Sequence, residues 1–231
     1  MAQERSLLYT PSGRAGEYAN HGYAANLYRG CTHGCQYCYV PASTRMSRED
    51  FHSGVVPVKD MIKRLTADMK RVGKLDEPIF LCFTCDPYCI DAPREMTRAA
   101  IEIIMEAGNA VNILTKGGDL AIADFDLLRK NPKNKIGATL TFSNEALSKE
   151  WEPLAASPLH RVYMLAMAKD KGIQTWASIE PVIFPSQSLQ IMEEALPHVD
   201  EFKIGIWNHD YRAINRERVR KYRARKMMAH V

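Results

Sequence analysis

The stretch that decides the fold runs from Tyr28 to Tyr39 and reads YRGCTHGCQYCY. It places Cys31, Cys35 and Cys38 on one short loop with the spacing C-x3-C-x2-C. Three such thiols indicate a metal centre, because free cysteines usually lie among buried apolar side chains and not beside histidine, glycine and glutamine. Structural zinc usually takes four protein ligands, whereas a cubic iron–sulfur cluster on three cysteines keeps one iron open for chemistry. The loop therefore favours an iron–sulfur cluster.

Outside this loop, short apolar runs alternate with segments of helical period. Strands are expected near Leu27 and over residues 79–84, 110–115, 136–142, 173–179 and 202–207, with helices over 57–71, 93–108, 120–129, 159–171 and 189–196 and around Trp151. Strands that alternate with helices in this way form right-handed βαβ units around a parallel sheet. About six units are too few for a closed eight-stranded barrel. The expected fold class is therefore α/β, an open, partial (β/α)6-type barrel.

In such sheets the chemistry lies at the carboxyl ends of the strands. The segments expected there each carry polar or cysteine residues directly after an apolar strand: Arg29–Cys31, Thr84–Asp86, Thr115–Lys116, Thr139–Thr141, Ser178–Glu180 and Trp207–His209. We therefore expect their side chains to surround one site.

Composition limits the class of protein. The chain has 231 residues, of which 46% are hydrophobic and 25% charged, which is typical of a globular domain. No apolar run approaches the ~20 residues that span a bilayer, and the first residues lack a signal-peptide profile. We therefore expect no membrane segment and a cytoplasmic location, where six cysteines do not form disulfides.

The positive charge is concentrated near the C-terminus. Residues 210–231 hold eight Lys/Arg and two Asp/Glu, a net charge of +6, whereas the remainder holds 23 and 25, a net charge of −2. Such a block favours a polyanion such as nucleic acid, or the acidic surface of a protein partner; alternatively it is a solvated helix. The expected division is an extended lead-in over residues 1–27, the barrel over 28–209 and a basic C-terminal helix or tail over 210–231.

The cysteine loop resembles the signature of the radical S-adenosylmethionine (SAM) superfamily, C-x3-C-x-(aromatic)-C, which Cys31, Cys35, Tyr37 and Cys38 fill. The resemblance implies a 4Fe-4S cluster whose open iron is chelated by SAM. It also implies reductive cleavage of SAM to methionine and a 5′-deoxyadenosyl radical, with an electron donor such as flavodoxin or ferredoxin. The partial barrel of that superfamily agrees with the strand count.

Further segments are similar to the spore photoproduct lyase-like branch, which includes small radical proteins of phages and mobile elements: Gly13–Tyr18, Tyr28–Cys35, Tyr37–Pro41, Asp86–Tyr88, Thr97–Ala100 and Leu114–Lys116. The lyase repairs a thymine dimer and uses a cysteine hydrogen donor just before its second-strand aspartate. Neither Cys82 nor Cys85 has the lyase spacing, so the resemblance does not carry the repair activity to this chain.

The resemblance assigns the SAM-binding residues. It places methionine recognition at Thr84 and Asp86, because an ammonium group needs carboxylate or hydroxyl acceptors. It places Tyr37 against the adenine and Glu180 near the ribose hydroxyls or the sulfonium. Alternatively, Asp86 starts a turn before a proline and Glu180 is a capping or salt-bridging carboxylate.

The remaining assignments concern two further cofactor contacts and the residues that face the substrate. Lys116 and Thr141 are candidates for the SAM carboxylate and ribose, or have surface roles. The candidates for the substrate side are Tyr88, Asn208, His209, Arg216 and Arg220.

A second cysteine trio, Cys82, Cys85 and Cys89, has the spacing C-x2-C-x3-C. If strand alternation continues to Asp86, Cys82 faces inward as a buried floor residue and Cys85 points to the opposite face as a packing residue. Cys89 is then a loop thiol near the open face. Cys89 and Cys82 are candidate catalytic thiols for hydrogen-atom return or a redox relay; alternatively they are ordinary free thiols.

These observations favour a radical SAM enzyme that modifies or repairs a nucleic acid or nucleotide. One alternative is a radical SAM enzyme that acts on a peptide or small metabolite, with the basic segment bound to a partner protein. Another is a non-enzymatic nucleic-acid-binding protein that carries zinc or a cluster.

Overall fold

Six parallel strands and one antiparallel strand form the central sheet of the protein, which a computed structural model describes over residues 6–206. The strand order is β1-β2-β5-β6-β7-β8-β9, and only β1 runs antiparallel to its neighbour. The strands are β1 (Leu8–Tyr9), β2 (Ala24–Ala25), β5 (Ile79–Leu81), β6 (Val111–Thr115), β7 (Lys135–Thr139), β8 (Gln174–Val182) and β9 (Glu201–Ile206). Away from it, β3 (Tyr28–Arg29) pairs with β4 (Val56–Pro57).

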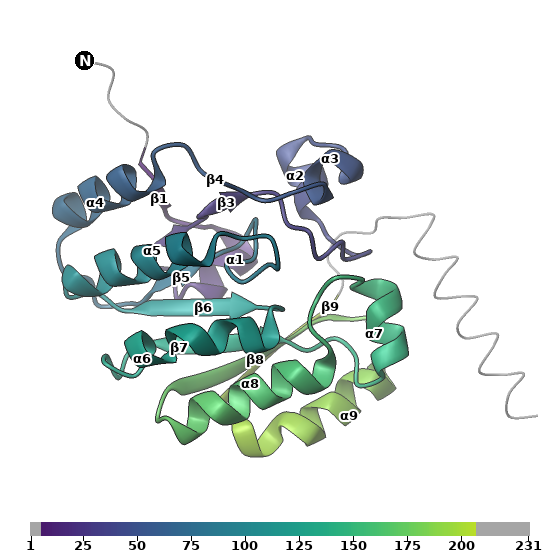
Figure 1. The fold of residues 1–231 in the computed structure, drawn as a ribbon. Helices are drawn as coiled ribbons and strands as arrows, with labels where there is room; N and C mark the ends of the chain where they lie inside the picture. The colour runs from purple at the N-terminus through teal and green to yellow at the C-terminus, as the bar shows by residue number, and fades with distance from the viewer. Residues whose placement is uncertain (1–5, 207–231) are drawn as a thin grey trace, which may run out of the picture.

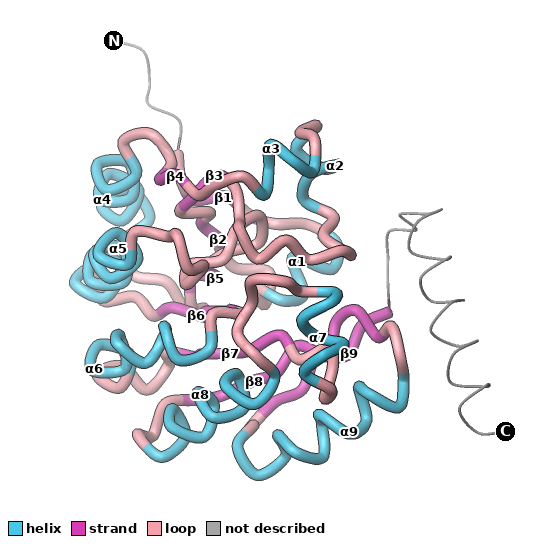
Figure 2. The backbone as a smooth tube through the Cα atoms, turned by 45° about the vertical axis from the view of Figure 1, so that its right-hand side comes forward, coloured by secondary structure: helices cyan, strands magenta, loops and turns pink. Residues whose placement is uncertain are grey.

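The helices that connect the parallel strands lie along one face of this sheet, and Figure 2 shows the strands inside the row that they form. They are α4 (Met61–Val72), α5 (Arg94–Glu106), α6 (Phe125–Leu128) after the 3-10 helix η1 (Gly118–Asp124), α8 (Pro158–Asp170) and α9 (Pro185–Ala195) before η2 (Leu196–His198). Because helices cover one face and the site loops the other, the central strands are buried almost completely.

Shorter helices lie toward the carboxyl ends of the strands, on the right of Figure 1. These are α2 (Val40–Thr44), α3 (Arg48–His52) and α7 (Glu145–Trp151). The cysteine loop runs from the end of β3 to the start of α2, which is one of these short helices. The loop therefore lies at the same end of the sheet. The fold therefore brings the loop to the strand ends.

The short helix α1 (Gly13–Tyr18) joins the two ends of the sheet. It follows edge strand β1, yet Arg14 Nη2 donates to the carbonyl of Ile204 in the opposite edge strand at 2.7 Å, and Lys203 Nζ donates to the carbonyl of Glu17 at 3.3 Å. The sheet therefore curves until the lead-in segment reaches its last strand. Within residues 6–206 the two edge strands do not pair, so the barrel is open.

The sequence predictions can now be compared with these elements. The α/β class and the six parallel strands of a partial barrel are confirmed. The lead-in, expected to be extended, contains β1, α1 and β2, and two of these belong to the sheet. The segment 120–129 begins as the 3-10 helix η1 and continues as the short helix α6, and α2 and α3 were not predicted.

Two other expectations concern the C-terminal segment and membranes. The basic helix or tail over residues 210–231 lies outside the described residues. Among residues 6–206, no helix combines the length and the apolar character needed to span a bilayer.

Candidate active site

A cavity of about 430 Å³ lies at the carboxyl ends of the parallel strands. Its walls include segments from four strand ends and from the cysteine loop, as the strand-end argument predicted. The strand-end residues that line it are Thr84, Asp86, Thr115, Lys116, Thr139, Ser178 and Glu180. A cavity of this size suits a cofactor with part of a substrate.

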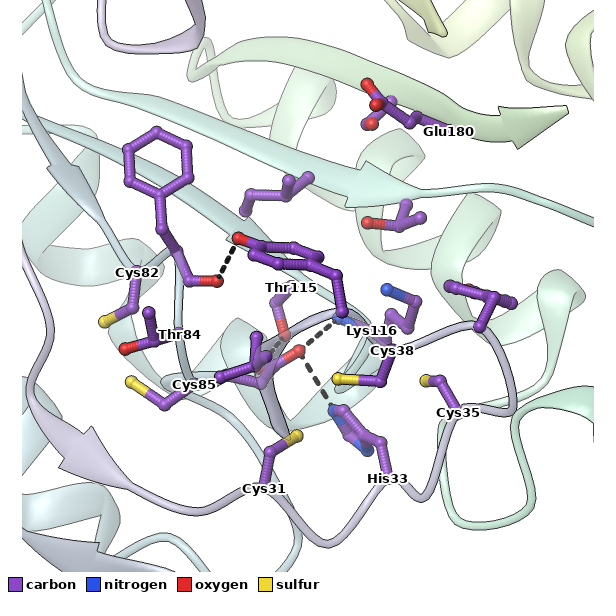
Figure 3. Close-up of a pocket in the computed structure, with 18 of the residues that line it drawn as sticks. Cys31, His33, Cys35, Cys38, Cys82, Thr84, Cys85, Thr115, Lys116 and Glu180 are labelled. Carbon is purple, nitrogen blue, oxygen red and sulfur yellow. Dashed lines mark hydrogen bonds and ion pairs between the residues drawn. The ribbon is translucent and has the colours of Figure 1, made fainter. Parts of the chain in front are cut away.

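Cys31, Cys35 and Cys38 line one side of this cavity, and Figure 3 shows their thiol groups gathered there. The glycine before the first cysteine is required by the backbone. Gly30 has φ +83°, and a Cβ at this position would lie 2.0 Å from the carbonyl oxygen of Gly54. Only glycine fits such a close approach with positive φ.

The three thiols fit an iron–sulfur cluster. Burial raises the pKa of Cys35 to about 12 and also raises the pKa of Cys38, so neither thiolate is stable there without a compensating cation. A metal centre supplies that positive charge, and the cavity leaves open space beside the thiols. The donor set is therefore suited to a cluster with one iron free of protein ligands.

A second group of potential metal ligands shares Cys31 with this loop. The ligand atoms of Cys31, His33 and Cys89 lie within 4.8 Å of one another. However, the His33 ring is already engaged, with Nε2 2.9 Å from Asp86 Oδ2 and Nδ1 3.2 Å from the carbonyl of Leu154. This group therefore does not compete with the cysteine loop for a metal.

Asp86 connects the cysteine loop to the end of β6. Its Oδ1 accepts hydrogen bonds from the Thr115 hydroxyl at 2.6 Å and the Tyr88 N–H at 2.9 Å, and its Oδ2 accepts the Lys116 N–H at 2.7 Å and pairs with His33. Burial alone would raise the pKa of Asp86, but His33 and these donors lower it to about 2. The carboxylate is therefore ionised and fully engaged within the protein.

Tyr37 is fixed by a buried charged network. Its hydroxyl donates to Glu152 and lies 3.2 Å from Thr141 Oγ1, while the Lys116 ammonium lies 5.5 Å from the ring centroid. Glu152 in turn pairs with Arg161 at 2.5 Å, and both side chains are 1% exposed or less. The network therefore holds the Tyr37 ring in the cavity wall.

Glu180 lies on the opposite side of the cavity, in β8. Its Oε2 accepts hydrogen bonds from Arg14 Nε at 3.0 Å and from the Tyr18 hydroxyl at 2.7 Å. Gly205 in β9 permits this arrangement, because a Cβ there would lie 2.5 Å from the Glu180 carboxyl group. Helix α1 therefore positions the carboxylate that faces the cysteine loop.

Comparison with known proteins identifies the family of this chain. Residues 25–197 match the family described as the radical SAM superfamily. The chain belongs to the radical SAM superfamily. The family match confirms the predicted superfamily, and iron–sulfur and SAM binding are implied by the family.

The relatives of this radical SAM chain are mostly longer proteins. Uncharacterized protein MJ0683 of Methanocaldococcus jannaschii is 29% identical over 162 residues, which cover 70% of this chain and 60% of that protein. Uncharacterized protein ORF301 of Acidianus two-tailed virus is 26% identical over 203 residues, 82% of this chain and 65% of that protein. The chain thus spans less than two thirds of both.

Solved structures share the fold of this radical SAM chain. A spore photoproduct lyase variant with bound AdoMet and dinucleoside spore photoproduct superposes with a TM-score of 0.64 at 18% identity, over 87% of this chain and 60% of that one. Streptococcus suis SuiB bound to S-adenosylmethionine gives 0.52 at 11% identity, over 90% and 44%. The similarity to the lyase is one of fold and agrees with the predicted partial barrel.

The second cysteine trio of the radical SAM chain is not arranged as predicted. Strand β5 ends at Leu81, so strand alternation does not extend to Cys85, which lines the cavity together with Cys82. Cys89 is fully buried, and its thiol accepts a hydrogen bond from the Thr32 N–H at 3.1 Å. The expectation that Cys89 lies near the open face is therefore wrong. Cys85 packs against the core as expected and also lines the cavity.

The other predicted residues divide into three groups. Tyr37, Thr84, Asp86, Lys116 and Glu180 line the cavity. Thr141 is buried behind Tyr37, and Tyr88 is fully buried with its hydroxyl donating to Asp124 at 2.9 Å. Because this burial removes Tyr88 from the cavity, its assignment to the substrate side is withdrawn. Asn208, His209, Arg216 and Arg220 lie outside the described residues.

Proposed function

We propose that this chain holds a 4Fe-4S cluster on Cys31, Cys35 and Cys38, binds SAM in the adjoining cavity and acts on a nucleic acid or nucleotide. One observation carries the proposal: three cysteines with the family spacing line one side of a cavity at the carboxyl ends of a parallel sheet. When bound, the cluster supplies the electron that cleaves SAM to methionine and a 5′-deoxyadenosyl radical. A flavodoxin or ferredoxin is the proposed electron donor.

The protein's own residues bind and orient the cofactor. The Lys116 ammonium is proposed to bind the SAM carboxylate, and Thr84 supplies a hydroxyl acceptor for the ammonium group. Asp86 contributes mainly by holding the cysteine loop through His33, because its oxygens are already engaged. On the opposite wall, Glu180 is proposed for the ribose hydroxyls.

The nucleic-acid substrate class is supported by the lining of the cavity. Aromatic side chains of Tyr39 and Phe83 and the guanidinium of Arg14 line it. Aromatic rings stack on bases of any sequence, and cationic groups attract phosphate. Solved structures of spore photoproduct lyase, whose fold this chain shares, contain bound dinucleoside spore photoproduct. We do not assign the lyase reaction itself, since the cysteine spacing differs.

Anaerobic reconstitution tests the proposal. The parent chain is expected to bind about four irons and, with dithionite and SAM, to release 5′-deoxyadenosine. The triple variant Cys31→Ala/Cys35→Ala/Cys38→Ala should lose both properties. The matched control Cys82→Ser/Cys85→Ser should keep its iron, because those thiols are not proposed ligands.

Two results would overturn the assignment. A parent chain that binds zinc and stays colourless would indicate a structural metal. Iron retained by the triple variant would place the cluster elsewhere in the chain.

A further inference from the structure

The segment after β5 places two cysteines of the spacing C-x2-C in the cavity wall. Cys82 and Cys85 both line the cavity, and the Cys85 side chain lies close enough to Cys82 to help raise its pKa. In Figure 3 the two thiol groups lie next to each other, apart from the thiols of the cysteine loop. The two sulfur atoms are therefore neighbours although strand alternation would have separated them.

The backbone between the two cysteines is held in place. The side-chain oxygen of Asn26 accepts the N–H groups of Phe83 at 2.8 Å and of Thr84 at 2.9 Å. Directly after Cys85, the carboxylate of Asp86 is bound by four donors. Because the backbone between the two cysteines and the residue after Cys85 are both held in place, the two thiols stay close together. This favours reaction between them over reaction with distant cysteines.

The pair is better suited to thiol–disulfide chemistry than to metal binding. Within residues 6–206, no third His, Cys, Asp or Glu ligand joins Cys82 and Cys85 in a metal-binding group. The exposure of the two residues differs, since Cys82 is 5% exposed and Cys85 is half-buried. An accessible thiol beside a buried one can react with a disulfide in two steps.

We propose that Cys82 and Cys85 are a redox-active pair that closes to a disulfide, separate from the three cluster cysteines. In the first step the Cys85 thiolate attacks one sulfur of a small-molecule disulfide, and one thiolate leaves. In the second step the Cys82 sulfur attacks the Cys85 sulfur, and the second thiol leaves with the proton of Cys82. The pair loses two electrons, and the small disulfide is reduced to two thiols.

The disulfide would change the wall of the cavity that the proposed function assigns to SAM. Only this consequence rests on the proposed function; the closure of the pair does not. The cavity would thereby respond to the thiol–disulfide balance of its surroundings.

Peptide mapping with oxidised glutathione as the probe tests the pair. The cluster-loaded chain is equilibrated with the probe, alkylated and digested with trypsin, which releases Leu75–Arg94 with Cys82, Cys85 and Cys89 in one peptide. We expect two of the three cysteines to escape alkylation, with fragmentation placing the disulfide between Cys82 and Cys85. Excess dithiothreitol should restore full alkylation.

Single-cysteine variants show which thiol acts in each of the two steps. Cys85→Ser should abolish closure, and Cys82→Ser should leave a glutathione adduct on Cys85. Cys89→Ser is the matched control in the same peptide and should keep the disulfide. The Cys31→Ala/Cys35→Ala/Cys38→Ala variant should also keep it, so a failed cluster assignment and a failed redox pair give different results.

Three outcomes would overturn the proposal. They are full alkylation of all three cysteines under oxidising conditions, a parent chain that keeps the glutathione adduct without closing, and a disulfide that joins Cys85 to a cysteine other than Cys82.

Discussion

Two charged side chains, Glu152 and Arg161, determine where the Tyr37 ring lies. Glu152 accepts the Tyr37 hydroxyl and pairs with Arg161, whose Nη1 also donates to the carbonyl of Thr139 at 2.9 Å in β7. Burial alone would raise the pKa of Glu152, but the charges of Arg161 and Lys116 hold it below its usual value. The pair therefore remains ionised inside the protein.

Glu152→Gln should destabilise the chain strongly, because it leaves the Arg161 charge buried without its partner. Removal of one member of a buried ion pair costs about 3–5 kcal/mol of unfolding free energy. The double variant Glu152→Gln/Arg161→Met should recover much of this loss, since an apolar replacement of a whole buried pair is often tolerated. Urea denaturation of the three proteins measures the effect. Equal midpoints for Glu152→Gln and the parent would contradict it.

The same residues show what a sequence can predict at this scale. Cys31, Cys35, Cys38 and Tyr37 were identified because their spacing is local to one loop. Glu152 and Arg161 were not, since a glutamate before a proline and an arginine in an amphipathic helix are both typical of a solvated surface. Their pairing depends on tertiary contacts that bring α7 and α8 together behind the loop.

At the scale of elements, edge strand β1 depends on one carboxylate of α4. Asp68 Oδ2 accepts the N–H groups of Leu7 at 2.7 Å and Leu8 at 2.9 Å, and Oδ1 accepts the Ser6 hydroxyl at 2.8 Å. Burial alone would raise the pKa of Asp68, but these donors and Arg71 lower it below its usual value. Because the folded pKa is lower than the unfolded one, the stabilisation is complete above the ordinary pKa of an aspartate. It is lost as the pH falls through the folded value.

Asp68→Asn should therefore loosen β1 and remove this acid sensitivity. An amide cannot replace the charge-assisted hydrogen bonds, so hydrogen-exchange protection of the Leu7 and Leu8 amides should fall roughly tenfold or more. Asp60→Asn is a suitable control, because Asp60 begins the same helix, is exposed and makes no side-chain capping bond. Unchanged protection in Asp68→Asn would show that strand pairing alone holds β1.

Element boundaries were predicted less well than element types, for local reasons. The apolar run from Ile79 continues past Leu81, but Asn26 takes the N–H groups of Phe83 and Thr84 that a longer strand would use. The segment after Lys116 contains Gly117 and Gly118, and the φ of +54° at Gly118 interrupts helical geometry. The helix expected over 120–129 begins instead as the 3-10 helix η1 and continues as α6.

For the whole molecule, the alternation of strands and helices was sufficient to predict the open parallel sheet. The rule that places chemistry at strand carboxyl ends then located the cavity. The role of α1 was not predictable in this way, because its contacts join residues about 190 positions apart in the chain. Contacts between residues so far apart in the chain leave no periodic pattern in the sequence.

The charge distribution of the whole chain leads to a prediction about nucleic-acid binding. Residues 217–231 hold six Lys/Arg and one Asp/Glu, so their deletion changes the net charge by −5, from +4 to −1. These residues lie outside the described range, and the prediction rests on their charge alone. The truncated chain should fold and bind iron, but its affinity for single-stranded DNA at low salt should fall at least roughly tenfold, because each phosphate contact releases counterions.

A titration over salt concentration distinguishes this effect from a loss of shape. The parent should show a steep fall in affinity with salt, and the truncated chain a shallower one. A full-length variant with the six bases replaced by glutamine should match the truncation, since it removes the same charges and keeps the length. Equal slopes for parent and truncation would assign the phosphate contacts to the cavity lining around Arg14. A parent that binds no DNA or RNA at low salt would favour a peptide or metabolite substrate, and a truncated chain that fails to fold would make the segment part of the packing.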